Sequence, residues 1–192
     1  PAHRPAGLLI IGPVMDRVPT AIARFLPVVA LFPRIATPVR SRPRRRACKE
    51  MNVETRVFVY GTLKRGFPNH ARFLGGARRL GEFQTVEAFP FVLNGRRCSP
   101  CLIDRPGAGQ TVQGEVYAVD AATLAALDRL ERTAAADGYH RRVIAVQSVA
   151  GPKQTRMTVH TYLKAPHLVN AAQTGYLTVY TPTLGARYRP RR

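Results

Sequence analysis

The run Arg56-Val57-Phe58-Val59-Tyr60-Gly61-Thr62-Leu63 decides how the rest of the sequence is interpreted. Its residues 57–60 are β-branched or aromatic, a composition typical of a buried strand. The run stops abruptly at Gly61, where a tight turn is expected because glycine tolerates turn conformations that other residues resist. The sequence therefore predicts a buried strand that enters a turn at residues 61–63.

Further strands and helices follow from the same kind of pattern. Four apolar runs, each bounded by Gly, Pro or Asn, are predicted strands; they cover residues 89–93, 112–119, 142–149 and 157–163. A short helix is expected over residues 71–76, and one strong helix lies between the second and third of these runs. Asp120 can cap the strong helix, which is expected to end before Asp137-Gly138. Strands around a single strong helix predict an α+β domain with a mainly antiparallel or barrel-like sheet.

Glu131 breaks the apolar pattern of the strong helix. Leu124, Leu127, Leu130 and Glu131 fall at positions i, i+3, i+6 and i+7, so the glutamate shares the face that looks inward. An ionised carboxylate costs several kcal/mol to bury unless it is paired or hydrogen-bonded. Two interpretations follow: a glutamate at the edge of this face that pairs with an arginine, or a buried general acid/base with a tuned pKa.

Residues 1–50 differ in composition from the rest of the chain. They hold eight of the sixteen prolines and ten Lys/Arg against two Asp/Glu. Three interpretations stay open: an organellar or secretory targeting segment, a disordered basic arm, and an artificially extended start that is not translated in the natural protein. Because a Met stands at position 51, just before the first strand, we expect a basic Pro/Arg-rich extension over residues 1–50 and one domain over residues 51–192.

The formal net charge of +19 raises a basic nucleic-acid-binding module as an alternative function. The arginine pairs are spread along the chain instead of being gathered in one stretch, and the sequence has no Trp to stack on bases. Residues 1–50 contribute +8 and residues 51–192 contribute +11, and a bias toward Arg, Ala and Pro also arises from GC-rich coding. We therefore expect no nucleic-acid partner. No run of eighteen apolar residues is present, so no membrane partner is expected either.

Cys98 and Cys101 have the C-x-x-C spacing of half a zinc site or of a redox pair. A structural zinc site needs two more ligands at suitable spacing, and the sequence has no such second pair. A redox pair normally opens a helix after a strand, whereas this one sits in a stretch rich in Pro and Arg. We expect two ordinary thiols on a loop or strand edge, and neither a metal nor a cofactor.

Several segments, in the same order, resemble the γ-glutamylcyclotransferase-like family and in particular its amine-specific, AIG2-like branch. The resemblance covers essentially all of residues 51–192 and rests on Val57-Phe58-Val59-Tyr60-Gly61-Thr62-Leu63-Lys64-Arg65-Gly66, Pro68-Asn69-His70, Gly114-Glu115-Val116-Tyr117, Leu127-Asp128-Arg129-Leu130-Glu131, Tyr139-His140-Arg141 and Gly185-Ala186-Arg187-Tyr188. Leu130 stands where the family usually has an aromatic residue. The resemblance implies a small β-barrel with flanking helices and a substrate cavity beside the Tyr-Gly-Thr-Leu turn.

The activity implied by the resemblance is release of an amine from a γ-glutamyl amide. The substrate's own α-amine attacks its γ-carbonyl and closes 5-oxoproline, so no nucleophilic side chain is needed. Glu131 matches the family's catalytic glutamate and would serve as the general acid/base. Backbone N–H groups of Gly61, Thr62 and Leu63, freed by the turn, suit a carboxylate or a developing oxyanion, and Gly61 would allow a close backbone approach.

Residues beside these carry less specific expectations. Tyr60 is expected either to line the cavity or to pack in the core with its hydroxyl on a backbone carbonyl. Tyr188 is a candidate for the pocket wall. Tyr139 and Arg141 are expected to tie the end of the helix to the next strand instead of touching substrate, and Glu115 to face solvent or to pair with an arginine.

The resemblance to the amine-specific branch implies γ-glutamyl-ε-lysine as substrate and lysine as the released amine. The alternatives are another γ-glutamyl compound, a γ-glutamyl group in a biosynthetic pathway, and a non-catalytic binding protein of the same fold, against which the presence of Glu131 argues. We expect a monomer with a small-molecule substrate. Because its three cysteines form no even set of disulfides, we expect it in the cytoplasm, while organellar targeting by residues 1–50 stays open.

Overall fold

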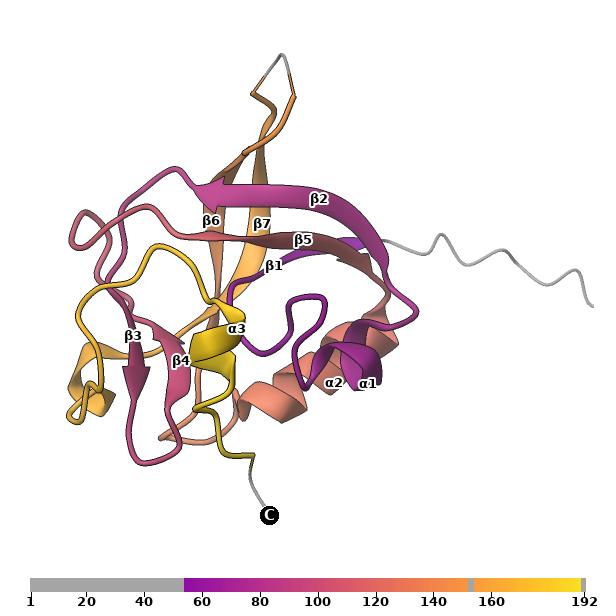
Figure 1. Ribbon diagram of the computed structural model, residues 1–192. Coiled ribbons are helices and arrows are strands. Elements are labelled where there is room, and N and C mark those ends of the chain that lie inside the picture. The colour runs from indigo at the N-terminus through magenta and orange to yellow at the C-terminus, as the bar shows by residue number, and fades with distance from the viewer. Residues whose placement is uncertain (1–53, 152–153, 191–192) are drawn as a thin grey trace, which may run out of the picture. The chain divides into compact units, whose positions relative to one another are not determined.

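Five strands close into a barrel in the order β1-β5-β2-β6-β7, as Figure 1 shows. These strands are β1 (Thr55–Val59), β2 (Arg78–Thr85), β5 (Gln113–Val119), β6 (His140–Ser148) and β7 (Arg156–Leu163). Neighbouring strands are antiparallel except for β1 and β7, which run parallel and close the barrel. This computed structural model describes residues 54–151 and 154–190, so the extension predicted over residues 1–50 lies outside the described residues.

A two-stranded sheet and short helices surround the barrel in the described part of the chain. The sheet consists of β3 (Phe91–Asn94) and β4 (Ser99–Leu102), and the helices are α1 (His70–Leu74), α2 (Ala121–Glu131), a 3-10 turn at Pro166–Leu168 and α3 (Pro182–Gly185). In Figure 1, α1 and α2 lie together at one side of the barrel. None of these helices has the length and apolar character needed to cross a membrane. The mixed barrel with few helices confirms the predicted α+β class.

Successive side chains of a strand point to opposite faces of the sheet, and the apolar side chains on the two faces form two separate cores. On β1, Phe58 contributes to a core that also includes Phe83, Val116, Val146 and Val159. The neighbouring β1 residues, Val57 and Val59, contribute to a second core with Tyr117, Val119 and Leu127, which joins the barrel to α1 and α2. The buried strand predicted from residues 56–60 thus has an apolar layer on each face.

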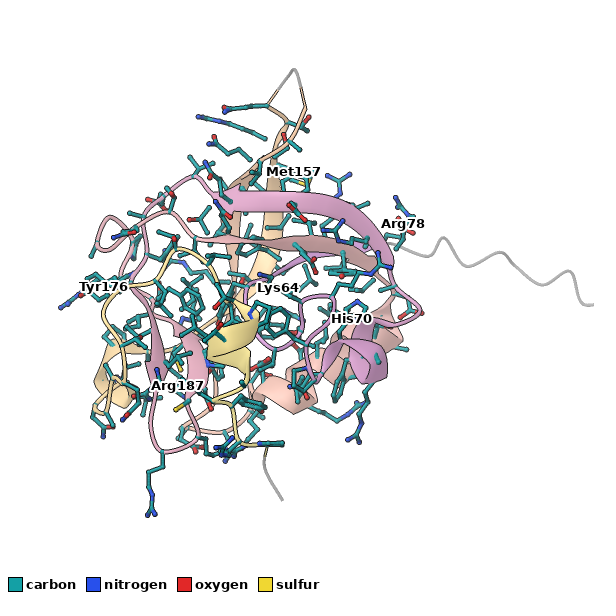
Figure 2. The ribbon with its side chains drawn as sticks, in the orientation of Figure 1. Lys64, His70, Arg78, Met157, Tyr176 and Arg187 are labelled. Carbon is teal, nitrogen blue, oxygen red and sulfur yellow. The ribbon has the colours of Figure 1, made fainter. Side chains whose placement is uncertain are left out.

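The sequence correctly placed five strands and missed two. The predicted strands at residues 56–60, 89–93, 112–119, 142–149 and 157–163 correspond to β1, β3, β5, β6 and β7. β2 was missed because Gly81, where the pairing with β5 shifts register, interrupts its alternation, and because Arg78 points away from the barrel (Figure 2). β4 was missed because it contains Pro100, which a strand paired on one side tolerates.

Helix α2 places Glu131 at its last position. Asp120 caps the helix as predicted, since its carboxylate accepts a hydrogen bond from the Thr123 N–H at 2.8 Å. The helix ends before Asp137, as predicted, at the point where Arg132 adopts a left-handed conformation with a φ of 57°. The loop that follows returns to the helix end, where the Tyr139 N–H donates to the Glu131 carbonyl at 3.0 Å. Glu131 and Tyr139 are therefore held next to each other.

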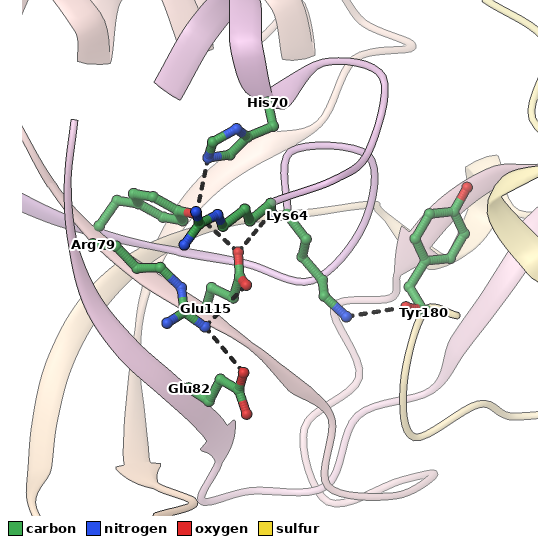
Figure 3. A network of polar contacts seen from close by, with 8 residues as sticks. Lys64, His70, Arg79, Glu82, Glu115 and Tyr180 are labelled. Atoms are coloured by element: carbon green, nitrogen blue, oxygen red, sulfur yellow. Dashed lines mark hydrogen bonds and ion pairs between the residues drawn. The ribbon is translucent and has the colours of Figure 1, made fainter. Parts of the chain in front are cut away.

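The loop from residue 60 to residue 69, here called the β1–α1 loop, is fastened to the barrel by Glu115 (Figure 3). The Glu115 side chain is 8% exposed, and its Oε2 accepts hydrogen bonds from the Arg65 N–H at 2.8 Å and the Tyr117 hydroxyl at 2.9 Å. Arg79 on β2 donates to Oε1 at 3.1 Å. Glu115 was expected to face solvent or to pair with an arginine; it pairs with Arg79 but is buried.

Two further contacts hold the same loop. Lys64 Nζ donates to the Tyr180 carbonyl at 3.0 Å, and His70 Nε2 lies 3.0 Å from the Tyr117 hydroxyl (Figure 3). Tyr117 therefore connects the start of α1 to Glu115, while Arg65 connects the middle of the loop to the same carboxylate. The β1–α1 loop is held at several points along its length and has a defined position on the barrel.

The protonation state of Glu115 follows from its partners. Burial by itself raises the pKa of this carboxyl, but hydrogen bonds from the Arg65 N–H and the Tyr117 hydroxyl, together with the charge of Arg79, outweigh burial and bring the pKa below its usual value. Glu115 is consequently ionised at neutral pH and contributes to stability in that form.

We predict that Glu115→Gln lowers the free energy of unfolding at pH 7 by about 1–3 kcal/mol, because donors that share one carboxylate lose an acceptor. The folded-state pKa lies below the unfolded one, so this contribution is present above the unfolded pKa of about 4.3 and disappears as the pH falls through the folded-state value. Urea denaturation at pH 7 and at stepwise lower pH should show the difference from wild type shrinking in acid.

Glu82→Gln is the matched control, because Glu82 also pairs with Arg79 at 3.0 Å but its side chain is 65% exposed. We expect it to change stability by less than about 0.5 kcal/mol. An equal loss in both variants, or a loss in Glu115→Gln that does not depend on pH, would contradict the assigned role.

Candidate active site

A cavity of about 390 Å³, here called the first cavity, lies among the β1–α1 loop, the end of α2, β4 and the C-terminal tail. The six residues expected from the sequence at a substrate site all line it: Tyr60, Gly61, Thr62, Leu63, Glu131 and Tyr188. These residues come from segments far apart in the sequence. The structure therefore brings together the predicted turn, the predicted acid/base and the candidate wall residue.

The turn at residues 61–63 has its carbonyl oxygens engaged. The Gly61 carbonyl accepts from the Lys64 N–H at 3.0 Å, and the Thr62 carbonyl accepts from the Asn69 N–H at 3.0 Å. The Asn69 amide also donates to the Thr62 hydroxyl at 2.9 Å. The hydrogen bond that closes the turn runs from the Lys64 N–H to the Gly61 carbonyl, so it does not use the N–H groups of Thr62 and Leu63. Both of these residues line the first cavity.

Gly61 is required by the packing of the turn against β4. A Cβ atom at this position would lie 2.5 Å from Cγ of Pro100, closer than real contacts allow. Because Gly61 has no side chain, the Pro100 ring can pack directly against its backbone. Pro100 also lines the first cavity. This contact sets the distance between the turn and the β3–β4 sheet.

Tyrosine hydroxyl groups around the first cavity are fixed by backbone acceptors. Tyr60 donates to the Tyr162 carbonyl at 2.6 Å and also lines the cavity, so both expectations for Tyr60 are met. Tyr139 donates to the Pro100 carbonyl at 3.1 Å and lies 3.0 Å from Sγ of Cys101. Tyr139 ties the end of α2 to the following strand, as expected, because its N–H donates to the Glu131 carbonyl, and it also lines the cavity.

The hydroxyl and thiol groups near Glu131 stay protonated at neutral pH. Burial raises the pKa of Tyr60 and of Tyr139 well above the usual value, and the negative charge of Glu131 adds to both shifts. Burial likewise raises the pKa of the Cys101 thiol to about 11. Tyr60 and Tyr139 donate their protons to backbone carbonyls, and none of these groups can act as a base at pH 7.

The charged residues of the first cavity have opposite signs. Among its lining residues, Glu131 carries the negative charge, and Arg72 and Arg97 carry the positive charge. Such a distribution suits a ligand that has both an ammonium and a carboxylate group. Apolar side chains, among them Phe73 and Leu130, also line the cavity.

The C-terminal tail is fastened over this cavity by two reciprocal hydrogen bonds. The Arg189 N–H donates to the Arg97 carbonyl at 3.0 Å, and Arg97 Nε donates to the Arg189 carbonyl at 3.0 Å. Tyr188, next to Arg189, lines the cavity. The tail thus supplies part of the wall, and its position depends on the turn between β3 and β4.

Several of the described arginines that stand in pairs along the chain, the pattern that motivated the nucleic-acid alternative, form ion pairs with carboxylates. The pairs include Arg78–Glu54, Arg79–Glu115, Arg141–Asp128 and Arg142–Asp104. The pairing of Arg141 with Asp128 on α2 confirms that Arg141 ties the helix to β6. Part of the positive charge is thus neutralised locally.

Cys98 and Cys101 are free thiols, and Cys101 lies on β4. Within residues 54–151 and 154–190, no three His, Cys, Asp or Glu side chains are grouped so as to hold a metal ion. Cys101 Sγ lies 3.0 Å from the hydroxyl of Tyr139, and Tyr139 lines the first cavity.

Comparison with known proteins agrees with this architecture. The family described as gamma-glutamyl cyclotransferase, AIG2-like, matches residues 57–179. Human gamma-glutamylaminecyclotransferase is 38% identical over 149 residues, which cover 70% of this chain and 96% of that protein. Zebrafish gamma-glutamylaminecyclotransferase B is 40% identical over 105 residues, which cover 53% of this chain and only 54% of the relative.

A solved structure of a mouse AIG2-like protein has the same fold. Its TM-score is 0.61 at 34% identity, and the match covers 72% of this chain and 97% of the mouse chain. The names of the relatives support an enzyme of the cyclotransferase class, as the sequence resemblance implied. Because the family match spans more than half of the sequence and includes the barrel strands from β1 to β7, this chain belongs to the gamma-glutamyl cyclotransferase, AIG2-like family.

Proposed function

We propose that this chain is a γ-glutamylamine cyclotransferase that releases lysine from γ-glutamyl-ε-lysine and forms 5-oxoproline. The observation that carries the proposal is that Glu131 and the turn at residues 61–63 line one cavity. The same chemistry would act on another γ-glutamyl amide, which is the alternative kept from the sequence. The proposal further assigns a monomeric enzyme in the cytoplasm.

The charges of the first cavity support binding of a γ-glutamyl group. This group carries an α-ammonium and an α-carboxylate, so it needs one negative and one positive partner. We assign the ammonium to Glu131 and the carboxylate to Arg72 and Arg97, all of which line the cavity. The N–H groups of Thr62 and Leu63 then face the γ-carbonyl oxygen, where negative charge develops during the reaction.

The reaction needs proton transfer between two nitrogen atoms of one substrate. Glu131 accepts a proton from the α-ammonium, and the freed nitrogen attacks the γ-carbonyl carbon to form the ring C–N bond. The carbonyl oxygen takes up the negative charge and is stabilised by the turn N–H groups. Glu131 then carries protons from the ring nitrogen to the departing nitrogen. When the original C–N bond breaks, the amine leaves as an ammonium ion and the Glu131 carboxylate is restored.

The protonation states of the neighbouring tyrosine and cysteine side chains support Glu131 as the base, because they exclude these side chains from that role. Tyr60, Tyr139 and Cys101 are protonated at neutral pH because burial raises the pKa of each group. Tyr60 and Tyr139 donate their hydroxyl protons to backbone carbonyls, and none of the three groups can take the substrate's proton. The rigid cavity contributes by holding the α-amine and the γ-carbonyl in contact, because correct orientation of an intramolecular pair removes much of the barrier.

We predict that Glu131→Gln lowers the rate of 5-oxoproline formation by at least about 100-fold, because glutamine keeps the shape of the side chain and loses its basicity. The measurement is 5-oxoproline release from γ-glutamyl-ε-lysine by chromatography. Glu87→Gln, the same change at an exposed position outside the cavity, should retain wild-type turnover. If Glu131→Gln keeps most of its turnover while remaining folded, the assignment of the acid/base is wrong.

We predict that Tyr188→Ala raises KM by about fivefold with little change in kcat, because loss of a half-buried aromatic wall removes about 1 kcal/mol of substrate binding. Tyr176→Ala is the matched control, since Tyr176 is 52% exposed and does not line the cavity (Figure 2). Steady-state kinetics on both variants provide the test. A fall in kcat at unchanged KM would place Tyr188 in the chemical step instead.

A further inference from the structure

Asn69, the residue that precedes α1, holds Thr62 through both its backbone and its side chain. The Asn69 N–H donates to the Thr62 carbonyl at 3.0 Å, and the Asn69 side-chain amide donates to the Thr62 hydroxyl at 2.9 Å. Both residues line the first cavity, and Thr62 is 8% exposed. The Thr62 side chain therefore has a fixed position in the cavity wall.

The side chain of Asn69 does not take the role that is usual at its position. An asparagine just before a helix commonly accepts a hydrogen bond from an N–H of the first helical turn, which stabilises the helix by about 1 kcal/mol. Asn69 makes no such capping bond, and its amide contacts Thr62 instead. A contact with the turn at residues 61–63 thus takes the place of a local stabilising contact, which points to a role at the cavity.

The direction of this hydrogen bond decides what the Thr62 hydroxyl can do. A hydroxyl carries one hydrogen and two lone pairs, whereas a side-chain NH₂ group can only donate. Because Asn69 is the donor, the Thr62 oxygen is the acceptor in this contact, and the Thr62 hydrogen is directed away from Asn69. Within residues 54–151 and 154–190, the Thr62 hydroxyl donates to no protein acceptor. Its hydrogen is therefore available to a ligand in the first cavity.

We propose that Asn69 is a positioning residue that holds the Thr62 hydroxyl as a third hydrogen-bond donor to the γ-carbonyl oxygen of the substrate. The inference rests on the proposed function, which places the N–H groups of Thr62 and Leu63 at the same oxygen. The hydroxyl keeps its proton throughout the reaction. Its hydrogen bond strengthens as negative charge develops on the oxygen, so Thr62 acts as a catalytic residue in the chemical step.

The fixed position of Thr62 makes its hydroxyl an effective donor. A donor that is already oriented needs no rearrangement when charge develops, and this is the main source of its effect on rate. Asn69 supplies that orientation in two ways, because it anchors the Thr62 carbonyl and occupies a lone pair of the hydroxyl. An acceptor in place of the Asn69 amide would attract the hydroxyl hydrogen and withdraw it from the substrate.

The first test removes the hydroxyl. Thr62→Val, which keeps the shape of the side chain, should lower kcat for 5-oxoproline release from γ-glutamyl-ε-lysine about 100-fold with little change in KM, the effect expected when one donor to the oxyanion is lost. Thr62→Ala, a second variant without a hydroxyl, should show the same fall. Thr62→Ser restores the hydroxyl and should recover most of the turnover.

The second test reverses the hydrogen bond. A carboxylate only accepts hydrogen bonds at neutral pH, so Asn69→Asp should draw the Thr62 hydrogen away from the cavity and lower kcat at least about tenfold. In the Thr62→Val background the same change should have little further effect, because no hydroxyl remains to be reversed. This comparison separates an action through Thr62 from a general effect of the added charge.

Matched controls carry the same substitutions elsewhere. Thr158→Val and Asn170→Asp change exposed residues that lie outside the first cavity and outside a second cavity of about 510 Å³ that shares Tyr139 with it. Both controls should keep the wild-type kcat and KM. Thermal unfolding checks that every variant is folded under the conditions of the assay.

The outcomes separate this inference from the proposed function. If folded Thr62→Val and Thr62→Ala keep the wild-type kcat, or only raise KM, the hydroxyl has no part in the chemical step and the inference is wrong, while the proposed function stands. If Asn69→Asp keeps its turnover, or loses as much in the Thr62→Val background as alone, Asn69 does not act through the hydroxyl. If the wild type releases no 5-oxoproline from any γ-glutamyl amide, the proposed function fails and the inference fails with it.

Discussion

One buried carboxylate, that of Glu115, fixes the part of the chain on which the cavity depends. It extends from β5 and accepts hydrogen bonds from the Arg65 N–H in the β1–α1 loop and from Arg79 on β2. Without a fixed loop, the turn at residues 61–63 would have no defined distance from Glu131 at the end of α2. The contact between Gly61 and Pro100 then sets the position of β4 relative to the same turn. Strand β5 thus positions the β1–α1 loop through Glu115, and the loop in turn positions β4, so that both walls of the first cavity depend on β5.

The acidic residues of this basic chain occupy its decisive positions. The chain has 30 basic and 11 acidic residues, so most arginines have no carboxylate of their own. Asp128 illustrates how the few acids are shared, since it binds both Arg141 and the Tyr162 hydroxyl and so joins α2 to two strands. The net charge therefore says little about how charge is used, because each of the few carboxylates is placed against particular partners.

The sequence predicted those features that depend on local pattern. Glu131 was singled out because it interrupts an apolar helix face, and the turn at residues 61–63 was predicted because a glycine ends a β-branched run; both line the first cavity. Features that depend on partners distant in the sequence were not found. Glu115 looked like an ordinary strand residue because its partners come from another loop and another strand. Tyr139 was assigned a structural role only, because the cavity behind it forms when β4 and the loop after α2 meet.

The parallel pairing of β1 with β7 has a consequence for how the enzyme becomes active during folding. Antiparallel hairpins such as β6–β7 can form early because their strands are neighbours in the sequence, whereas Val57 pairs with His160 across most of the domain. Closing so large a loop loses chain entropy before the contact stabilises anything, which makes closure a slow step. The first cavity takes one wall from β1 and another from the C-terminal tail. Catalytic competence should accordingly lag behind the appearance of secondary structure when the unfolded chain is refolded.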